Sequence, residues 1–258
     1  MDTGSDCAAT TLEMASERDK SLQSGARNEP AAAPSARAEI DAFLERARTL
    51  GATVEAGKRG RLVFALDATM SRQPTWDTAC RLQAEMFREA AAIGGLDVQL
   101  VYFRGLNECR ASRWVSDGAG LGDLMGRIHC VGGHTQIRKV LSHARAEHAR
   151  GKVAALVYVG DAMEEGIDDL AAGAGELGLL GIPAFVFQEG HDPVAEQAFR
   201  EIARLTRGAY CRFDLSAAHE LAELLRAAAV YAAGGVKALA DLSAKRSASA
   251  QKLLAQMR

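Results

Sequence analysis

The chain has 258 residues, of which 48% are hydrophobic and 25% are charged, and its formal net charge is -2. This composition is typical of a folded protein with one substantial core or two small ones. The balanced charge argues against nucleic acid or an anionic membrane as a partner. Because the sequence has no run of about 18 uncharged apolar residues, we also expect no membrane span.

Five cysteines are scattered along the chain, and none forms a C-x-x-C pair. An odd, dispersed set of this kind indicates reduced thiols rather than a disulfide framework. The N-terminus has no basic region leading into an apolar run, which a secretory signal would require. We therefore expect the protein to be cytoplasmic.

The N-terminal part of the chain differs in composition from the rest. Residues 1–37 are rich in Ala, Ser, Thr and charge, include Pro30 and Pro34 and have few bulky aliphatics. Such a segment cannot bury enough apolar surface to offset its ordering entropy, so we predict that it is disordered. Residues 38–57 should form a helix that stops at Gly51, followed by a linker.

Short apolar runs alternate with amphipathic stretches over residues 58–235. The runs predict strands at 61–66, 97–105, 152–162, 182–190 and 209–214. The stretches between them predict helices at 76–95, 121–130, 132–151, 164–181, 192–208 and 216–235. Residues 107–115 follow a short turn and should return as a strand that forms a hairpin with the one before it.

Strands with continuous apolar cores, separated by helices, indicate a mostly parallel sheet that is covered on both faces. The sequence therefore predicts an α/β fold over residues 58–235. We expect a doubly wound, mostly parallel sheet with one antiparallel edge strand and helices on both faces. Residues 236–258 should form a charged helical tail.

Polar side chains gather where the predicted strands end. Asp67 closes the first strand, and the hydroxyls of Thr69 and Ser71 follow at alternating positions. Asp161 closes the strand that we expect beside it, and Thr135 opens the helix that leads into that strand. Ligands of such sheets bind beyond the carboxyl ends of the strands, where the strand order reverses. These five side chains can therefore meet in one crevice.

The five side chains offer hard oxygen ligands, without sulfur or imidazole. Such a set suits Mg²⁺ or Mn²⁺, with water completing an octahedron, better than Zn²⁺. Several of the ligands are neutral, so the bound ion would keep positive charge and could attract a carboxylate from another molecule. The sequence thus predicts a divalent-cation site, with no catalytic residue and no organic cofactor.

This pattern resembles a von Willebrand factor A (VWA) domain with a metal-ion-dependent adhesion site (MIDAS), of the intracellular bacterial type and Rossmann-like fold. The family motif is Asp-x-Ser-x-Ser after the first strand, a Thr in a second loop and an Asp after the fourth strand. The corresponding residues here are Asp67, Thr69, Ser71, Thr135 and Asp161. The chain departs from the motif in having Thr69 for Ser and in lacking the Gly often found within it. The resemblance, which covers roughly residues 60–232, implies ligation by the hydroxyls and partly water-mediated ligation by the aspartates.

The same residues also have structural interpretations. Asp67 could cap the turn after the strand, and Ser71 could be a plain turn residue. Thr135 could cap its own helix. Glu164 and Glu165 could stabilise the start of the next helix through its dipole, or add negative field near the ion.

Neighbouring residues carry weaker signals. Arg72 and Gln73 directly follow the loop and are candidates for contact with a partner, whereas we expect Trp76 to pack in the core. His143 and His148 are five positions apart, which is not the spacing of a helical zinc pair. We expect both histidines on the surface.

Three functions are compatible with the sequence. The one we favour is a divalent-cation-dependent protein-binding module without enzymatic activity, whose ion accepts an acidic side chain of a protein partner. The second is a metal-assisted phosphoryl-transfer or hydrolytic enzyme, although the chain has neither a P-loop nor a G-x-S-x-G motif. The third is a metal-free adaptor that acts through its tails.

Overall fold

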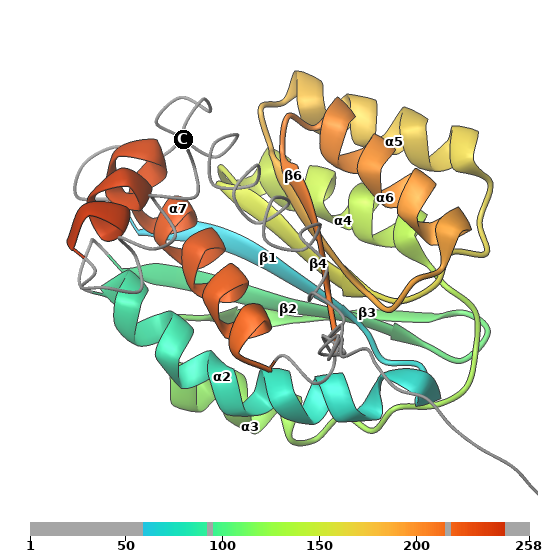
Figure 1. Cartoon of the computed structure of the whole chain (residues 1–258), viewed down its shortest axis with the longest axis horizontal. Helices are drawn as coiled ribbons and strands as arrows, with labels where there is room; N and C mark the ends of the chain where they lie inside the picture. The colour runs from blue at the N-terminus through green and yellow to red at the C-terminus, as the bar shows by residue number, and fades with distance from the viewer. Residues whose placement is uncertain (1–58, 92–94, 215–217, 246–258) are drawn as a thin grey trace, which may run out of the picture. The chain divides into compact units, whose positions relative to one another are not determined.

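The computed structural model of this chain describes residues 59–91, 95–214 and 218–245 (Figure 1). The predictions for residues 1–37 and 38–57, and for the end of the tail at 246–258, lie outside these described residues. None of the helices in the described part of the chain is long and apolar enough to cross a membrane.

The described residues contain a six-stranded sheet with the strand order β3-β2-β1-β4-β5-β6. Its strands are β1 (Gly60–Asp67), β2 (Leu96–Arg104), β3 (Glu108–Val115), β4 (Ala155–Gly160), β5 (Ala184–Glu189) and β6 (Ala209–Phe213). All neighbouring strands are parallel except β2 and β3, which are antiparallel. The predicted fold class, a mostly parallel sheet with one antiparallel edge strand, is confirmed.

Helices cover both faces of this sheet (Figure 1). One face carries α2 (Gln73–Ala91), α3 (Gly118–Met125) and α7 (Ala218–Lys245), and the other carries α4 (Ile137–Arg150), α5 (Ile167–Leu179) and α6 (Pro193–Leu205). The residues of β1 alternate between the two core clusters, with Leu62, Phe64 and Leu66 in one and Val63 and Ala65 in the other. Because both faces are buried, the strand needs apolar residues at successive positions, which explains its unbroken apolar run.

The structure changes the ends of several predicted helices. α2 begins earlier than predicted, directly after a short 3-10 helix, η1 (Met70–Arg72), whereas α3 ends at Met125 and α4 begins only at Ile137. Residues 126–136 consequently form a non-helical segment that carries Thr135 to the sheet edge. α7 continues past the predicted end through a kink at Gly235, whose φ of 68° lies in the left-handed region that glycine tolerates.

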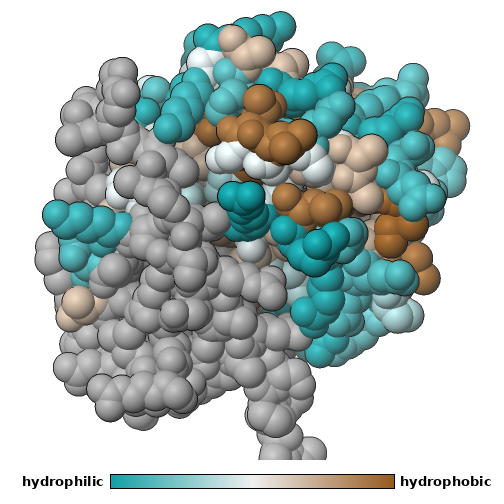
Figure 2. Space-filling model, turned by 90° about the horizontal axis from the view of Figure 1, so that it is seen from above, coloured by the Kyte–Doolittle hydropathy of each residue, from teal (hydrophilic) through white to brown (hydrophobic). Residues whose placement is uncertain are grey.

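Large hydrophobic side chains are exposed at six places among the described residues: Met70, Leu106, Val131, Leu179, Leu180 and Val194. On the face seen in Figure 2, hydrophobic residues form small groups that hydrophilic residues separate. The described part of this face therefore offers no broad apolar surface to a partner. The first three exposed side chains belong to loops at the carboxyl edge of the sheet, where the candidate site lies.

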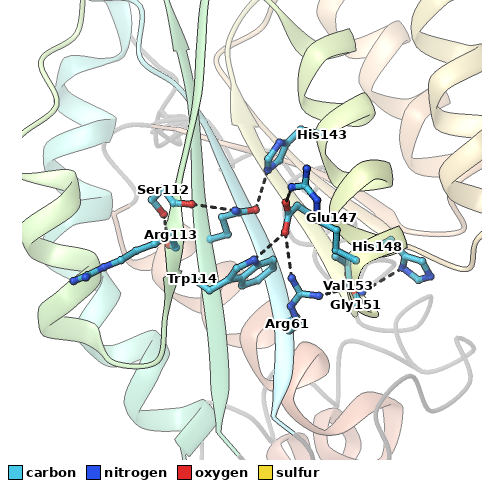
Figure 3. A network of polar contacts seen from close by, with 11 residues as sticks. Arg61, Ser112, Arg113, Trp114, His143, Glu147, His148, Gly151 and Val153 are labelled. Carbon is cyan, nitrogen blue, oxygen red and sulfur yellow. Dashed lines mark hydrogen bonds and ion pairs between the residues drawn. The ribbon is translucent and has the colours of Figure 1, made fainter.

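A polar network ties β1, β3 and α4 together at the opposite, amino edge of the sheet (Figure 3). At its centre is Glu147, which is 5% exposed and accepts hydrogen bonds from Arg61 Nη2 (3.2 Å) and Trp114 Nε1 (2.9 Å). The Arg61 guanidinium also lies over the Trp114 ring, 4.0 Å from its centroid, and donates to the Gly151 carbonyl. The network fixes the end of α4 against the first strand.

The sequence had predicted that His143 and His148 of α4 lie on the surface. The structure instead places both, partly buried, near this network. His143 Nε2 lies 2.8 Å from Gln99 Oε1, and His148 Nδ1 accepts a hydrogen bond from the Val153 N–H at 3.2 Å. Burial lowers the pKa of His143, which favours its neutral form. Both side chains therefore serve the packing of α4.

The charge of Glu147 is stabilised within the network. Burial alone raises the pKa of this carboxyl, but hydrogen bonds from Trp114 and Arg150 and the positive charge of Arg150 outweigh burial, so the pKa is lowered. A carboxylate with a lower pKa in the folded than in the unfolded chain stabilises the fold above its unfolded pKa. This contribution is lost as the pH falls through the folded value.

Glu147→Gln should lower the free energy of unfolding by about 2 kcal/mol at pH 7, because it leaves the Arg61 guanidinium without its counter-charge. Urea unfolding followed by circular dichroism measures this loss, which should shrink below about pH 4.5. The matched control is Glu176→Gln, whose ion pair with Arg145 is half exposed and should matter by less than about 0.5 kcal/mol. Equal losses in the two variants would contradict the role given to the network.

Candidate functional site

The parallel pairing of β1 with β4 brings two carboxylates to the same edge of the sheet. Asp67 is the last residue of β1 and Asp161 directly follows β4, and the register pairs Leu66 with Val159 just before them. The chain connects β1 to β2 on one side, and β4 lies on the other side of β1. This is the reversal of strand order at which the sequence predicted a ligand site.

Asp67 is almost fully buried, with 2% of its surface exposed. Its Oδ1 accepts a hydrogen bond from the Thr69 N–H at 2.7 Å, which is the turn-capping role considered as its structural interpretation. Its Oδ2 is buried too, but has no hydrogen-bond partner among the described residues. A buried carboxylate oxygen of this kind is a place where a cation or water from solution stabilises the protein.

The hydroxyls of the loop after β1 form a short chain of hydrogen bonds to Asp161. η1 turns the loop so that Thr69 Oγ1 and Ser71 Oγ lie 3.3 Å apart, and Ser71 Oγ donates to Asp161 Oδ2 at 3.0 Å. Together with the bond between Asp67 and the Thr69 N–H, these contacts join four of the five predicted ligands. Their binding of a metal stays a prediction.

Thr135 lies on the loop before α4 and is tied to the loop that carries Asp161. Its N–H donates to Glu164 Oε2 at 3.0 Å, and its Oγ1 accepts from the Glu164 N–H, also at 3.0 Å. α4 begins at Ile137 with Gln136 as its N-cap, so Thr135 does not cap the helix. Within the described residues no hydrogen bond joins Thr135 to the other four predicted ligands, and its part in the site also stays a prediction.

Glu165 supplies the cap that α4 lacks from its own residues. Its two carboxylate oxygens accept hydrogen bonds from the N–H groups of Ile137 (2.5 Å) and Arg138 (3.0 Å). The sequence had suggested that Glu164 and Glu165 stabilise the next helix. They hold the start of α4 instead, because the loop after β4 folds back over that N-terminus.

Arg72 is buried beneath the loop, so its prediction as a contact for a partner is wrong. It is 1% exposed and forms an ion pair with Glu189 at the end of β5. The Thr75 hydroxyl donates to the same carboxylate. Because Arg72 directly follows Ser71, this pair anchors the hydroxyl-bearing loop to the sheet.

The residues after Arg72 begin α2. Gln73 is half-buried, and its Nε2 donates to the exposed Asp77 Oδ1 at 2.8 Å, so its contact with a partner stays a prediction. Trp76 is 2% exposed and donates its Nε1–H to the Met125 carbonyl at 3.2 Å, which confirms its predicted place in the core.

Burial dominates the electrostatics of the site. It raises the pKa of the Asp67 carboxyl to about 6, although hydrogen bonds from Thr69 act in the opposite direction. The charge of Asp161 raises this pKa further, and the guanidinium of Arg72 lowers it. Burial also raises the pKa of the Tyr158 hydroxyl, which has no hydrogen-bond partner among the described residues. A positive ion here would lower the free-energy cost of charging Asp67.

The donor set fits a hard divalent cation. The four predicted ligands that hydrogen bonds join offer two carboxylates and two hydroxyls, which with water suit Mg²⁺ or Mn²⁺. In the part of the chain that the structure describes, no three side chains of His, Cys, Asp or Glu converge to hold a metal. A cation at this site would therefore depend on the hydroxyls and on water as well as on the two aspartates.

Comparisons with known proteins bear on the fold. No protein-family model matches the sequence, and no curated protein matches it. Among solved structures, a von Willebrand factor type A protein from Catenulispora acidiphila is 18% identical, with a TM-score of 0.55 over 68% of this chain and 43% of that one. Proximal thread matrix protein 1 from the mussel byssus, with a zinc-occupied MIDAS motif, is 14% identical, with a TM-score of 0.56 over 69% of this chain and 48% of that one. The SpRpn10 VWA domain is 10% identical, with a TM-score of 0.52 over 66% of this chain and 98% of that one.

These similarities show that the chain has a VWA fold. At such low identities they show the fold alone. The chain spans less than half the length of the first two proteins and nearly all of the third, so the shared part is one VWA domain.

With a chelator present, Asp67→Asn should stabilise the protein at pH 8, because the wild-type protein keeps a charged carboxylate buried. A folded-state pKa of about 6 against the ordinary value of 3.8 corresponds to a cost of about 3 kcal/mol above pH 6. The cost disappears as Asp67 takes up a proton, so the advantage of the variant should vanish near pH 4. Urea unfolding in EDTA at the two pH values measures it.

The control for this experiment is Asp168→Asn, which changes an exposed aspartate in the first turn of α5 and should give no gain. If Asp67→Asn is less stable than the wild type at pH 8, or if its gain persists at pH 4, Asp67 does not carry a buried, uncompensated charge.

Proposed function

We propose that this chain is a divalent-cation-dependent protein-binding module. The ion, Mg²⁺ or Mn²⁺, would accept an acidic side chain of a protein partner. Its ligands would be Asp67, Thr69, Ser71, Thr135 and Asp161. The observation that carries the proposal is the buried Asp67 carboxylate, whose Oδ2 has no hydrogen-bond partner among the described residues and which lies beside hydroxyls joined to Asp161. The VWA fold supports a role in protein interaction.

The predicted ligands would have different roles in binding the ion. Asp67 and Asp161 supply the negative charge that attracts the ion. The hydroxyls of Thr69 and Ser71 are neutral, so they leave part of the ion's charge uncompensated. When bound, the ion supplies a positive centre for a carboxylate oxygen of the partner. Arg72, paired with Glu189, keeps the loop in place.

The identity of the ion is part of the proposal. Hard oxygen donors favour Mg²⁺ or Mn²⁺ over softer metals. The structure of the mussel protein, however, has zinc in its MIDAS motif. Zn²⁺ therefore belongs in the tests beside the two ions that the donor set favours.

We further propose that the module binds without catalysing a reaction and acts in the cytoplasm. Ser71 donates to Asp161, and a carboxylate is a poor base toward a hydroxyl because their ordinary pKa values lie far apart. Cys80, Cys109 and Cys130 form no disulfide bond, which supports a reducing environment.

Mg²⁺ should raise the melting temperature of the wild-type protein, because the site exists only in the folded state. At a free concentration of about 100 times the dissociation constant, the gain in stability is about 2.7 kcal/mol. Asp67→Ala should abolish the shift, whereas Asp168→Ala, which removes an exposed acid outside the site, should keep it. Thermal unfolding of the three proteins with Mg²⁺, Mn²⁺ and Zn²⁺ in turn measures this. A shift of equal size in Asp67→Ala would place the ion elsewhere.

A protein partner should be captured only when the ion and Asp67 are both present. The tagged full chain would be used to purify partners from a lysate of its own cells, with Mg²⁺, with EDTA, and as Asp67→Ala. Mass spectrometry would identify the bound proteins. Asp168→Ala serves as the matched control and should capture the same partner as the wild type. A partner that survives both chelation and the loss of Asp67 would move the function to another surface or to the tails.

A further inference from the structure

Three exposed hydrophobic side chains lie on loops at the carboxyl edge of the sheet, and two of these loops carry predicted ligands. Met70 is 62% exposed, Leu106 is 77% exposed and Val131 is 44% exposed. They belong to the loop after β1, the turn between β2 and β3, and the loop before α4. We call these three side chains the apolar rim.

Backbone contacts hold the three loops against one another. The Val131 N–H donates to the Ala68 carbonyl at 3.0 Å, and the His134 N–H donates to the Gly105 carbonyl at 3.1 Å. Gly133 packs so closely on Gly105 that a Cβ added to Gly133 would lie 2.0 Å from the Gly105 carbonyl oxygen. The three loops therefore form one packed unit around the site.

The residues of the apolar rim are close neighbours of predicted ligands, either in the sequence or through backbone hydrogen bonds. Met70 stands between the two hydroxyl residues of the loop after β1. The Val131 N–H donates to the carbonyl of Ala68, the residue before Thr69. Leu106 follows Gly105, whose carbonyl accepts a hydrogen bond from the residue before Thr135. The three exposed side chains therefore belong to loops that border the predicted ligands.

Core packing does not account for the apolar rim. Burying apolar surface stabilises a protein by about 25 cal/mol per Å², and this stabilisation is absent where the surface stays exposed. A partner that covers the rim would remove this surface from water. Met70 in particular has a flexible side chain that can adapt to the shape of what covers it.

We propose that the apolar rim selects the partner of the cation site: an extended segment whose Glu or Asp is flanked by large aliphatic or aromatic residues. An extended chain advances about 3.3 Å per residue, so side chains within two positions of the carboxylate stay near it. Those side chains would cover the rim while the carboxylate binds the ion. This inference rests on the proposed function, because the rim has this role only if a carboxylate is brought to the site.

A peptide-display library tests the inference directly. Short peptides with a fixed central Glu and random flanking residues are selected on the immobilised full chain in Mg²⁺ and eluted with EDTA. A parallel library with a fixed central Gln controls for the carboxylate. We expect large apolar residues to be enriched within two positions of the Glu, and the Gln library to give no EDTA-sensitive binding.

Variants of the rim show whether it causes the selection. One variant combines Met70→Ser, Leu106→Ser and Val131→Ser. The matched control is Leu179→Ser, which removes a 91% exposed side chain at the C-terminal end of α5. A selected peptide should bind the triple variant at least about tenfold more weakly than the wild type, and the control equally well. Leu106→Ser alone changes no residue of the hydroxyl-bearing loop, and its melting temperature should respond to Mg²⁺ as the wild type does.

The outcomes separate this inference from the proposed function. If Glu is selected in a Mg²⁺-dependent way but its neighbours stay random, or if the triple variant binds as well as the wild type, the inference is overturned and the proposed function stands. If neither library gives Mg²⁺-dependent binding of a carboxylate, the proposed function and the inference fail together.

Discussion

The burial of the Asp67 carboxylate at the end of β1 is the constraint on which the rest of the candidate site depends. A charge withdrawn from water is stable only where other groups replace the lost hydration. The Thr69 N–H and the positive charge of Arg72 provide part of this replacement, and a cation can provide the remainder. Without an ion, Asp67 either carries its charge at a cost or takes up a proton.

Several side chains that are not predicted ligands give the site its form. Arg72 and Glu189 fasten the hydroxyl-bearing loop to β5, and Glu164 and Glu165 fasten the loop after β4 to the start of α4. Each contact uses a charged group to satisfy backbone or side-chain groups that would otherwise be buried without partners. The loops are therefore positioned by electrostatic contacts above an apolar sheet.

Apart from the edge strand β3, the strands could be predicted from the sequence because both faces of the sheet are buried, which leaves apolar runs such as that of β1. The meeting of Asp67 and Asp161 followed from the general rule for the carboxyl edge of such sheets. The burial of Arg72 could not be predicted, because its partner lies on β5, far along the chain, and arginine is mostly exposed. The same holds for the cap of α4, which Glu165 supplies from a loop beyond the next strand.

The hydrogen bond from Ser71 to Asp161 joins residues 90 positions apart. Closing a loop of this length costs conformational entropy before the contact stabilises the chain, so we expect the contact to form late in folding. The crevice that holds Asp67, Ser71 and Asp161 forms only once β4 has paired with β1. An ion that bound there would find no site during the early steps of folding. It would act on a domain that is already assembled, and would slow its unfolding rather than speed its folding.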